Sequence, residues 1–236
     1  MQKLGMITEK YDRLVIFDTE TTGLDFKRDE IIEFSAVVVD IMDGQAQIVQ
    51  EYDNLVSLTP GNTVPEAITQ LTGISTEDIA QRGIPKEQLC RDIAGMIGGN
   101  TLLLAYNAHF DLSFLFYLLL RNGDPAILKG KDKLDLLTVY KDRKPYPHKL
   151  CNAIEAYHLT DQVVNSHRAI DDVLATVAVM EAMVQERDDL ECYVNLFGYN
   201  PKYGISGKPI GSVRYKAQPF HNANAQFIKK LYQDTL

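Results

Sequence analysis

The order of the expected elements predicts an α/β fold with a mixed β-sheet. Three segments of strand composition come first, at residues 13–20, 29–40 and 45–58, and short turns containing Gly or Asp separate them. Helical patterns then alternate with a further apolar strand at residues 101–106. Strands at hairpin spacing predict an antiparallel meander, and the later strand–helix alternation predicts parallel strands with helices on both faces of the sheet.

The helical segments share apolar residues at spacings of three and four. Two of them also have Pro near the start and Gly at the end, which is the usual order of helix signals. The predicted helices are residues 64–73, 85–99, 109–123, 149–159 and 171–187. No internal repeat or low-complexity segment interrupts this order.

The composition is that of a soluble globular protein with a sizeable core. The chain has 236 residues, of which 45% are hydrophobic and 24% charged. The longest apolar run, residues 114–120, is far shorter than the roughly 20 residues that cross a bilayer, so no membrane partner is expected. The N-terminus has no signal-peptide pattern, and the three scattered cysteines form no disulfide framework. These features predict a cytoplasmic protein.

Charge divides the chain into two parts. The formal net charge is −8, but residues 191–236 hold six Lys or Arg against two acidic residues. The predicted organisation is therefore a main domain at residues 1–190 and a basic, aromatic extension at 191–236 that packs on it. The extension's aromatic residues are Tyr193, Phe197, Tyr199, Tyr203, Tyr215, Phe220, Phe227 and Tyr232.

Two carboxylates end the first apolar strand, within "LVIFDTETTGL". Asp18 and Glu20 are two residues apart, so in a strand both point to the same face. Like charges this close repel by several kcal/mol at an effective dielectric of about 20. A raised pKa or a divalent cation such as Mg²⁺ or Mn²⁺ would offset that cost. The alternative is a strand end in water, where both acids are solvated.

Two further segments place acids near helix starts. Asp111 shares a helical face with Phe114, Leu115 and Leu118, although an acid near a helix N-terminus also complements the helix dipole. "SHRAIDDVLAT" contains His167 followed by two adjacent acids, Asp171 and Asp172. Helical periodicity does not choose between these two acids.

Taken together, these motifs resemble the DEDDh family of 3′–5′ exonucleases over most of residues 10–185. "FDTETTGL" with "IIEFSAVVVD" resembles the first motif and the strand after it, "YNAHFDLSFL" the second, and "HRAIDDVLATVAVM" the third. The His-to-Asp spacing of that family selects Asp172 over Asp171. One departure is Tyr106, where many relatives have His. The resemblance implies a ribonuclease H-like fold of three layers, with a mixed sheet between helices.

The resemblance also implies a metal centre and a base. Its implied ligands for two Mg²⁺ or Mn²⁺ ions are Asp18, Glu20, Asp111 and Asp172. Asp18 would bridge both ions, Glu20 would also be catalytic, and His167 would be the general base that takes a proton from the attacking water. Histidine suits proton transfer near neutral pH.

The implied substrate is the 3′ end of single-stranded or frayed DNA, cut to nucleoside 5′-monophosphates. The implied contacts to the terminal nucleotide are Thr21, Leu24, Asn107, Phe110 and His167. An epsilon-like proofreading or repair role, with a DNA polymerase subunit as partner, follows from the same resemblance. An RNA 3′-trimming enzyme of this fold and a non-catalytic nucleic-acid or polymerase-binding module remain alternatives. The extension would hold single-stranded substrate, dock a partner or cover the core.

Overall fold

The computed structural model describes residues 4–164, 166–205 and 209–218. Among these residues, five strands form one sheet in the order β3-β2-β1-β4-β5. The strands are β1 (Arg13–Thr21), β2 (Ile31–Met42), β3 (Gln45–Leu55), β4 (Thr101–Ala105) and β5 (Asp132–Asp135). β2 pairs in antiparallel fashion with β1 on one side and β3 on the other, whereas β4 runs parallel to both β1 and β5. The predicted meander followed by parallel strands is confirmed.

The predicted helices are all present, and others accompany them. The helices are α1 (Ile7–Lys10), α2 (Glu66–Thr72), α3 (Thr76–Arg82), α4 (Lys86–Met96), α5 (Ala108–Asn122), α6 (Leu136–Arg143), α7 (Leu150–Ala156) and α8 (Ala169–Glu186). Short 3-10 turns occur at η1 (Pro125–Leu128) and η2 (Leu190–Tyr193). No helix in the described part of the chain is both long and apolar enough to span a lipid bilayer.

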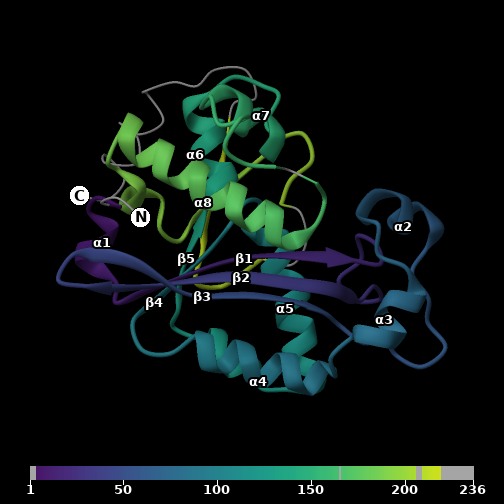
Figure 1. Ribbon diagram of the computed structural model, residues 1–236. Helices are drawn as coiled ribbons and strands as arrows, with labels where there is room; N and C mark the ends of the chain where they lie inside the picture. The colour runs from purple at the N-terminus through teal and green to yellow at the C-terminus, as the bar shows by residue number, and fades with distance from the viewer. Residues whose placement is uncertain (1–3, 165, 206–208, 219–236) are drawn as a thin grey trace.

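Helices cover both faces of the sheet, as Figure 1 shows with α6, α7 and α8 on one side and α4 on the other. The alternation of β1 divides its side chains between two cores. Leu14 and Ile16 join the core under α6–α8, and Val15 and Phe17 join the core under α4 and α5. The acid that follows at position 18 therefore continues the α8 side of the strand.

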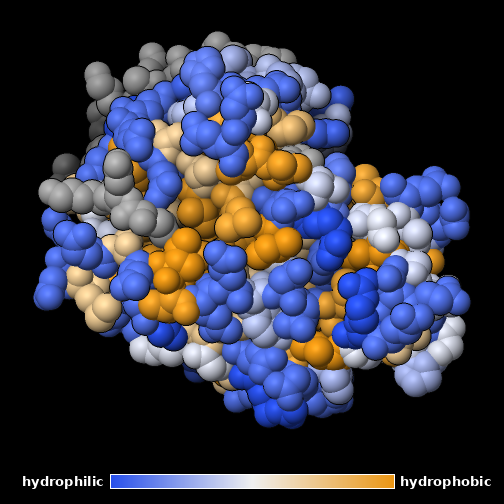
Figure 2. Space-filling view, viewed as in Figure 1, coloured by the Kyte–Doolittle hydropathy of each residue, from blue (hydrophilic) through white to orange (hydrophobic). Residues whose placement is uncertain are grey.

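The surface over α8 is partly apolar. Figure 2 shows hydrophobic residues gathered over α8 and the neighbouring part of the sheet, with hydrophilic residues over most of the remaining face. Ile41, Leu174 and Ala178 are partly buried and pack against the α8-side core. The apolar stripe of α8 packs the helix against the sheet.

The C-terminal segment adds a small parallel sheet of β6 (Leu196–Tyr199) and β7 (Arg214–Ala217). Leu196 joins the α8-side core and Phe197 the α5-side core. Gly198 N donates a 2.8 Å hydrogen bond to the Thr138 hydroxyl on α6. The division into domains at residue 190 stays a prediction. The predicted contributors of the extension that lie outside the described residues are Phe220, Phe227, Tyr232, Lys208, Lys229 and Lys230.

Candidate active site

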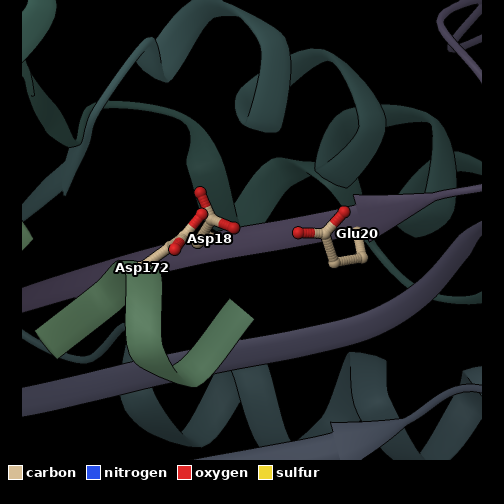
Figure 3. Close-up of side chains that lie close together, drawn as sticks. All are labelled: Asp18, Glu20 and Asp172. Atoms are coloured by element: carbon tan, nitrogen blue, oxygen red, sulfur yellow. The ribbon is translucent and has the colours of Figure 1, made fainter. Parts of the chain in front are cut away.

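Three carboxylates meet at the end of β1. Asp18 and Glu20 on β1 and Asp172 on α8 each offer an oxygen within 4.8 Å of the others, the arrangement found among the described residues that could hold a metal ion. Figure 3 shows the Asp18 and Asp172 carboxylates side by side, with Glu20 further along the strand. Side-chain alternation places both β1 acids on the face that α8 covers, and Asp172 lies in the first turn of α8.

Asp111 lies next to this group of three, on the first turn of α5. Its Oδ1 accepts hydrogen bonds from the Thr19 backbone N–H at 3.0 Å and from the Thr19 hydroxyl at 2.8 Å. Its side chain is buried, and after burial its charge is the largest of the influences that raise the pKa of Asp18. The Asp111 carboxylate is therefore tied to the backbone between the two β1 acids.

Burial and mutual repulsion raise the pKa of these acids. Burial raises the pKa of Asp18 well above its usual value, and the charges of Asp111, Asp172 and Glu20 raise it further. Burial and the Asp172 charge raise the pKa of Glu20 to about 8. Burial raises the pKa of Asp111 to about 7, although the hydrogen bonds from Thr19 oppose the rise. Such a cluster is stabilised by positive charge brought to it.

The donor set fits hard divalent cations. Every side chain of the cluster offers carboxylate oxygen, the ligand type that Mg²⁺ and Mn²⁺ prefer. Asp18 and Glu20 take part in no salt bridge within the described residues. Asp18, Glu20, Asp172 and Asp111 are therefore the residues that would hold metal ions.

A buried ion pair beside the cluster was not predicted. Glu33 on β2 lies opposite Glu20 in the strand register and is fully buried. Its Oε1 accepts hydrogen bonds from two guanidinium nitrogens of Arg168, the Nε at 2.9 Å, and its Oε2 accepts one from the Ala169 backbone N–H at 2.8 Å. The pair fastens the start of α8 to β2, and so positions Asp172. An acid inside the apolar run "IIEFSAVVV" was the available signal.

The structure places His167 and the two acids after it differently. His167 lies exposed in the loop before α8, with a left-handed backbone (φ 58°). Asp172 reaches the carboxylate cluster, whereas Asp171 Oδ2 accepts a hydrogen bond from the Ser166 hydroxyl. His167 precedes Asp172 by five residues and lies outside the helix, and its role as a base stays a prediction.

The predicted substrate contacts surround the end of β1 and the start of α5. Thr21 is buried and its hydroxyl donates a 2.6 Å hydrogen bond to the Gly23 carbonyl. Leu24 is 84% exposed, which is not the environment of a core residue. Asn107 is exposed and left-handed (φ 70°) at the cap of α5, and Phe110 packs against Phe114 at a centroid distance of 4.9 Å. These four roles stay predictions.

Tyr106 has a structural partner. Its hydroxyl donates a 2.9 Å hydrogen bond to the His148 carbonyl, on the segment before α7. The ring is buried between α6 and the sheet, and it meets Tyr140 at 6.5 Å. The departure from the family pattern at position 106 therefore affects packing rather than the carboxylate cluster.

Comparison with known proteins decides the family. The sequence model of the family described as "Exonuclease" matches residues 15–180. The chain belongs to this exonuclease family. The predicted resemblance is thereby confirmed, and exonucleases of this fold depend on metal ions.

Curated relatives share part of their length with this exonuclease domain. The chain is 30% identical over 228 residues to the DNA polymerase III PolC-type of Clostridium perfringens, covering 94% of this chain and 14% of the relative. It is 34% identical over 150 residues to the 3′–5′ exonuclease DinG of Bacillus subtilis, covering 63% of this chain and 14% of the relative. The chain thus spans about a seventh of these relatives' length (14% of each).

Solved structures confirm the fold. A structure of E. coli exonuclease I with a dT13 oligonucleotide superposes with a TM-score of 0.65 at 21% identity, covering 75% of this chain and 41% of that one. Exonuclease I of Methylocaldum szegediense gives 0.62 at 22% identity, covering 74% and 40%. The three-layer ribonuclease H-like architecture is shared with both.

Proposed function

We propose that this exonuclease domain hydrolyses the last phosphodiester bond at the 3′ end of single-stranded or frayed DNA and releases nucleoside 5′-monophosphates. The observation that carries the proposal is the meeting of Asp18, Glu20 and Asp172 within 4.8 Å in a chain of the exonuclease family. Two supporting facts come from other proteins: DinG is named a 3′–5′ exonuclease, and exonuclease I has been crystallised with dT13.

Asp18, Glu20, Asp111 and Asp172 would hold two Mg²⁺ or Mn²⁺ ions. Two divalent ions about 3.5–4 Å apart stabilise the entering and leaving oxygens of an in-line displacement at phosphorus. The protein's own contribution is rigidity. β1 carries two ligands, the Thr19 hydrogen bonds hold the third, and the Glu33–Arg168 pair fixes the helix that carries the fourth.

His167 would accept the proton of the attacking water. Its loop is exposed, so water reaches the imidazole and the proton can pass on to solvent. Hydrogen bonds of catalytic bases are often long before substrate binds, so the imidazole would reach the attacking water in the complex with the 3′ end.

The 3′-terminal nucleotide would lie between Leu24 and the start of α5. The 84% exposure of Leu24 leaves its side chain available to wedge against the last base. Thr21 and Asn107 would contact the sugar and phosphate, and Phe110 would stack on a base. These contacts read no base edge, so cleavage should depend on the free end more than on sequence.

The partner of this domain would be a DNA polymerase. The PolC-type relatives carry the similar segment inside DNA polymerases, which favours proofreading over other roles. Metal-dependent trimming of RNA 3′ ends uses the same set of side chains and is the alternative substrate class.

The test is a release assay with matched DNA and RNA. A 5′-labelled single strand of each sugar type is incubated with Mg²⁺ or Mn²⁺, with and without EDTA, beside a DNA strand whose 3′ end is blocked by a phosphate. We expect stepwise shortening of the free DNA end, its loss with EDTA, and little cutting of the blocked end. Chelator-resistant or absent release would contradict the proposal, and faster loss of RNA would change the substrate class.

A further inference from the structure

A cavity lies beside the candidate active site, on the side of the C-terminal segment. Its volume is about 170 Å³, and it lies between the start of α5, α6 and residues 197–205. A separate apolar cavity beside α5 is larger, at about 320 Å³. Drug-sized ligands occupy about 300–1,000 Å³, so the smaller cavity has room for a fragment such as one planar base. We call it the C-terminal cavity; its walls include Asn107, Lys141, Tyr199, Tyr203 and Tyr215.

We propose that the C-terminal cavity is a subsite for the base of the nucleotide on the 5′ side of the scissile bond. The proposal rests on the proposed function and gives the described part of the extension a role in holding single-stranded DNA. It names a contact outside residues 15–180, the segment that the exonuclease family model matches.

Asn107 and Asp135 connect the cavity to the carboxylate cluster. Asn107 is a predicted contact of the terminal nucleotide and also lines the cavity. The backbone N–H groups of Asn107 and Ala108 donate to Asp135 Oδ1 at 3.0 and 3.1 Å. The Asp135 charge acts on Asp111 on one side and on Lys141 and Tyr215 on the other. A single-stranded DNA that leaves the carboxylate cluster past Asn107 therefore meets this cavity next.

The cavity is walled by aromatic rings that are already fixed. Tyr215 meets His109 edge-to-face at 5.8 Å, and Phe197 meets both rings at 6.4 Å or less. Tyr203 differs from them, because it is 74% exposed at the rim, on a turn where its backbone N–H donates to the Asn200 carbonyl at 3.1 Å. An exposed ring at the rim of such a cavity offers a stacking face to a base of any identity.

Positive charge also lies at this cavity, although the chain as a whole carries −8. Lys141 lines it from α6, and the Lys202 ammonium lies 5.2 Å from the Tyr203 ring centroid. The Asp135 carboxylate also lines the cavity, but it accepts hydrogen bonds from three backbone N–H groups and the Thr138 hydroxyl. An acidic protein repels a polyanion except where cations gather, so a phosphate beside Lys141 and Lys202 has a local attraction. Rings with adjacent lysines favour single-stranded nucleic acid over an apolar peptide as the occupant.

The experiment compares substrates with and without an upstream nucleotide. Thymidine 5′-monophosphate p-nitrophenyl ester presents only the terminal nucleotide, and single-stranded DNA of about ten nucleotides presents the upstream base as well. Full-length wild type, Tyr203→Ala, Tyr203→Phe and Lys141→Gln are assayed on both substrates with Mg²⁺.

Tyr203→Ala should raise the KM for the oligonucleotide five- to tenfold and leave kcat unchanged, because one base stack is lost. Tyr203→Phe should retain the wild-type KM, and the ester should be cut equally by all variants. Lys141→Gln should lower the slope of log KM against log salt by about 0.7, the value for one phosphate contact on a single strand.

Two results would overturn the subsite. An unchanged KM for the oligonucleotide in Tyr203→Ala would show that the ring does not bind substrate. An equal rise in the KM for the ester would show that the ring contacts the terminal nucleotide instead. Failure of the wild type on both substrates would instead refute the proposed function, so the two failures are distinguishable.

Discussion

Glu20 and Glu33 face each other across neighbouring strands, yet their surroundings differ completely. Glu33 is 0% exposed and receives its hydrogen bonds from Arg168 and the Ala169 backbone. Glu20 is half-buried, takes part in no salt bridge within the described residues, and has its pKa raised to about 8 by burial and by Asp172. The chain pairs Glu33 with a cation of its own, whereas Glu20 has no ion pair within the described residues.

Asp135 shows that this chain can satisfy buried acids where they are structural. It accepts hydrogen bonds from the backbones of Asn107, Ala108 and Leu137, and from the Thr138 hydroxyl at 2.6 Å. Buried carboxylates are costly unless they are paired. The repulsion left in the cluster of Asp18, Glu20 and Asp172 is therefore the reason why we propose it as a site for cations.

The largest effect should follow from removing one ligand. Asp172→Asn should lower kcat on single-stranded DNA by about a thousandfold or more, since metal ions supply several kcal/mol of transition-state stabilisation. Asp171→Asn is the matched control, because this neighbour bonds Ser166 instead of entering the cluster. The measurement is steady-state nucleotide release with Mg²⁺. Equal activity in the two variants would remove Asp172 from the metal centre.

His167 should be needed for turnover but not for metal binding. His167→Asn should lower kcat by about 10²–10⁴-fold, the usual contribution of a general base, and Asn tolerates the left-handed backbone at this position. His158→Asn is the control, because His158 is also exposed and left-handed. Mg²⁺-induced thermal stabilisation should be unchanged in both. A His167 variant with wild-type kcat would exclude its role as the base.

Metal ions should stabilise the domain more at high pH than at low pH. The pKa of Glu20 in the folded state is about 8 and that of Asp111 about 7, above their ordinary values of 4.5 and 3.8. A raised pKa means that the folded state favours the protonated acid, so metal-free stability is intact below about pH 4 and falls as the pH rises towards 8.

Saturating Mg²⁺ should offset this loss. At about 100 times the dissociation constant a ligand adds about 2.7 kcal/mol, which is roughly 5–10 °C in Tm for a domain of this size. We expect that rise at pH 8, a much smaller one at pH 5, and a reduced one in Asp172→Asn at pH 8. Thermal unfolding followed by circular dichroism measures it, and a rise that is equal at both pH values would contradict the repulsion.

Breaking the Glu33–Arg168 pair should lower the stability of the domain more than its activity. Arg168→Met leaves Glu33 buried without its cation and should lower the free energy of unfolding by about 1.5–3 kcal/mol, because hydrogen bonds to a charged group are lost. The Arg168 side chain is 38% exposed, so water replaces part of the contact. Urea unfolding measures the change, with the exposed Arg28→Met as control. An unchanged midpoint would show that the pair does not fasten α8.

The sequence predicts the members of the carboxylate cluster better than the contacts that hold them in place. Asp18 and Glu20 follow from strand alternation, because the period of two is local. The choice of Asp172 over Asp171 needed the family spacing, since a helix presents adjacent acids to overlapping faces. The Glu33–Arg168 pair joins residues 135 positions apart, so no local sequence pattern predicts it. β5 has only the sequence "DKLD", whose apolar content is too low to indicate a buried strand.

Equilibrium titration with Mn²⁺ at pH 8 tests the central claim most directly, in the wild type, Asp18→Asn, Asp172→Asn and Asp171→Asn. A cation site formed by the cluster predicts saturable binding of two ions per chain in the wild type and in Asp171→Asn, and weakened binding in the two cluster variants. Absent binding in the wild type, or binding that Asp18→Asn and Asp172→Asn leave unchanged, would contradict it.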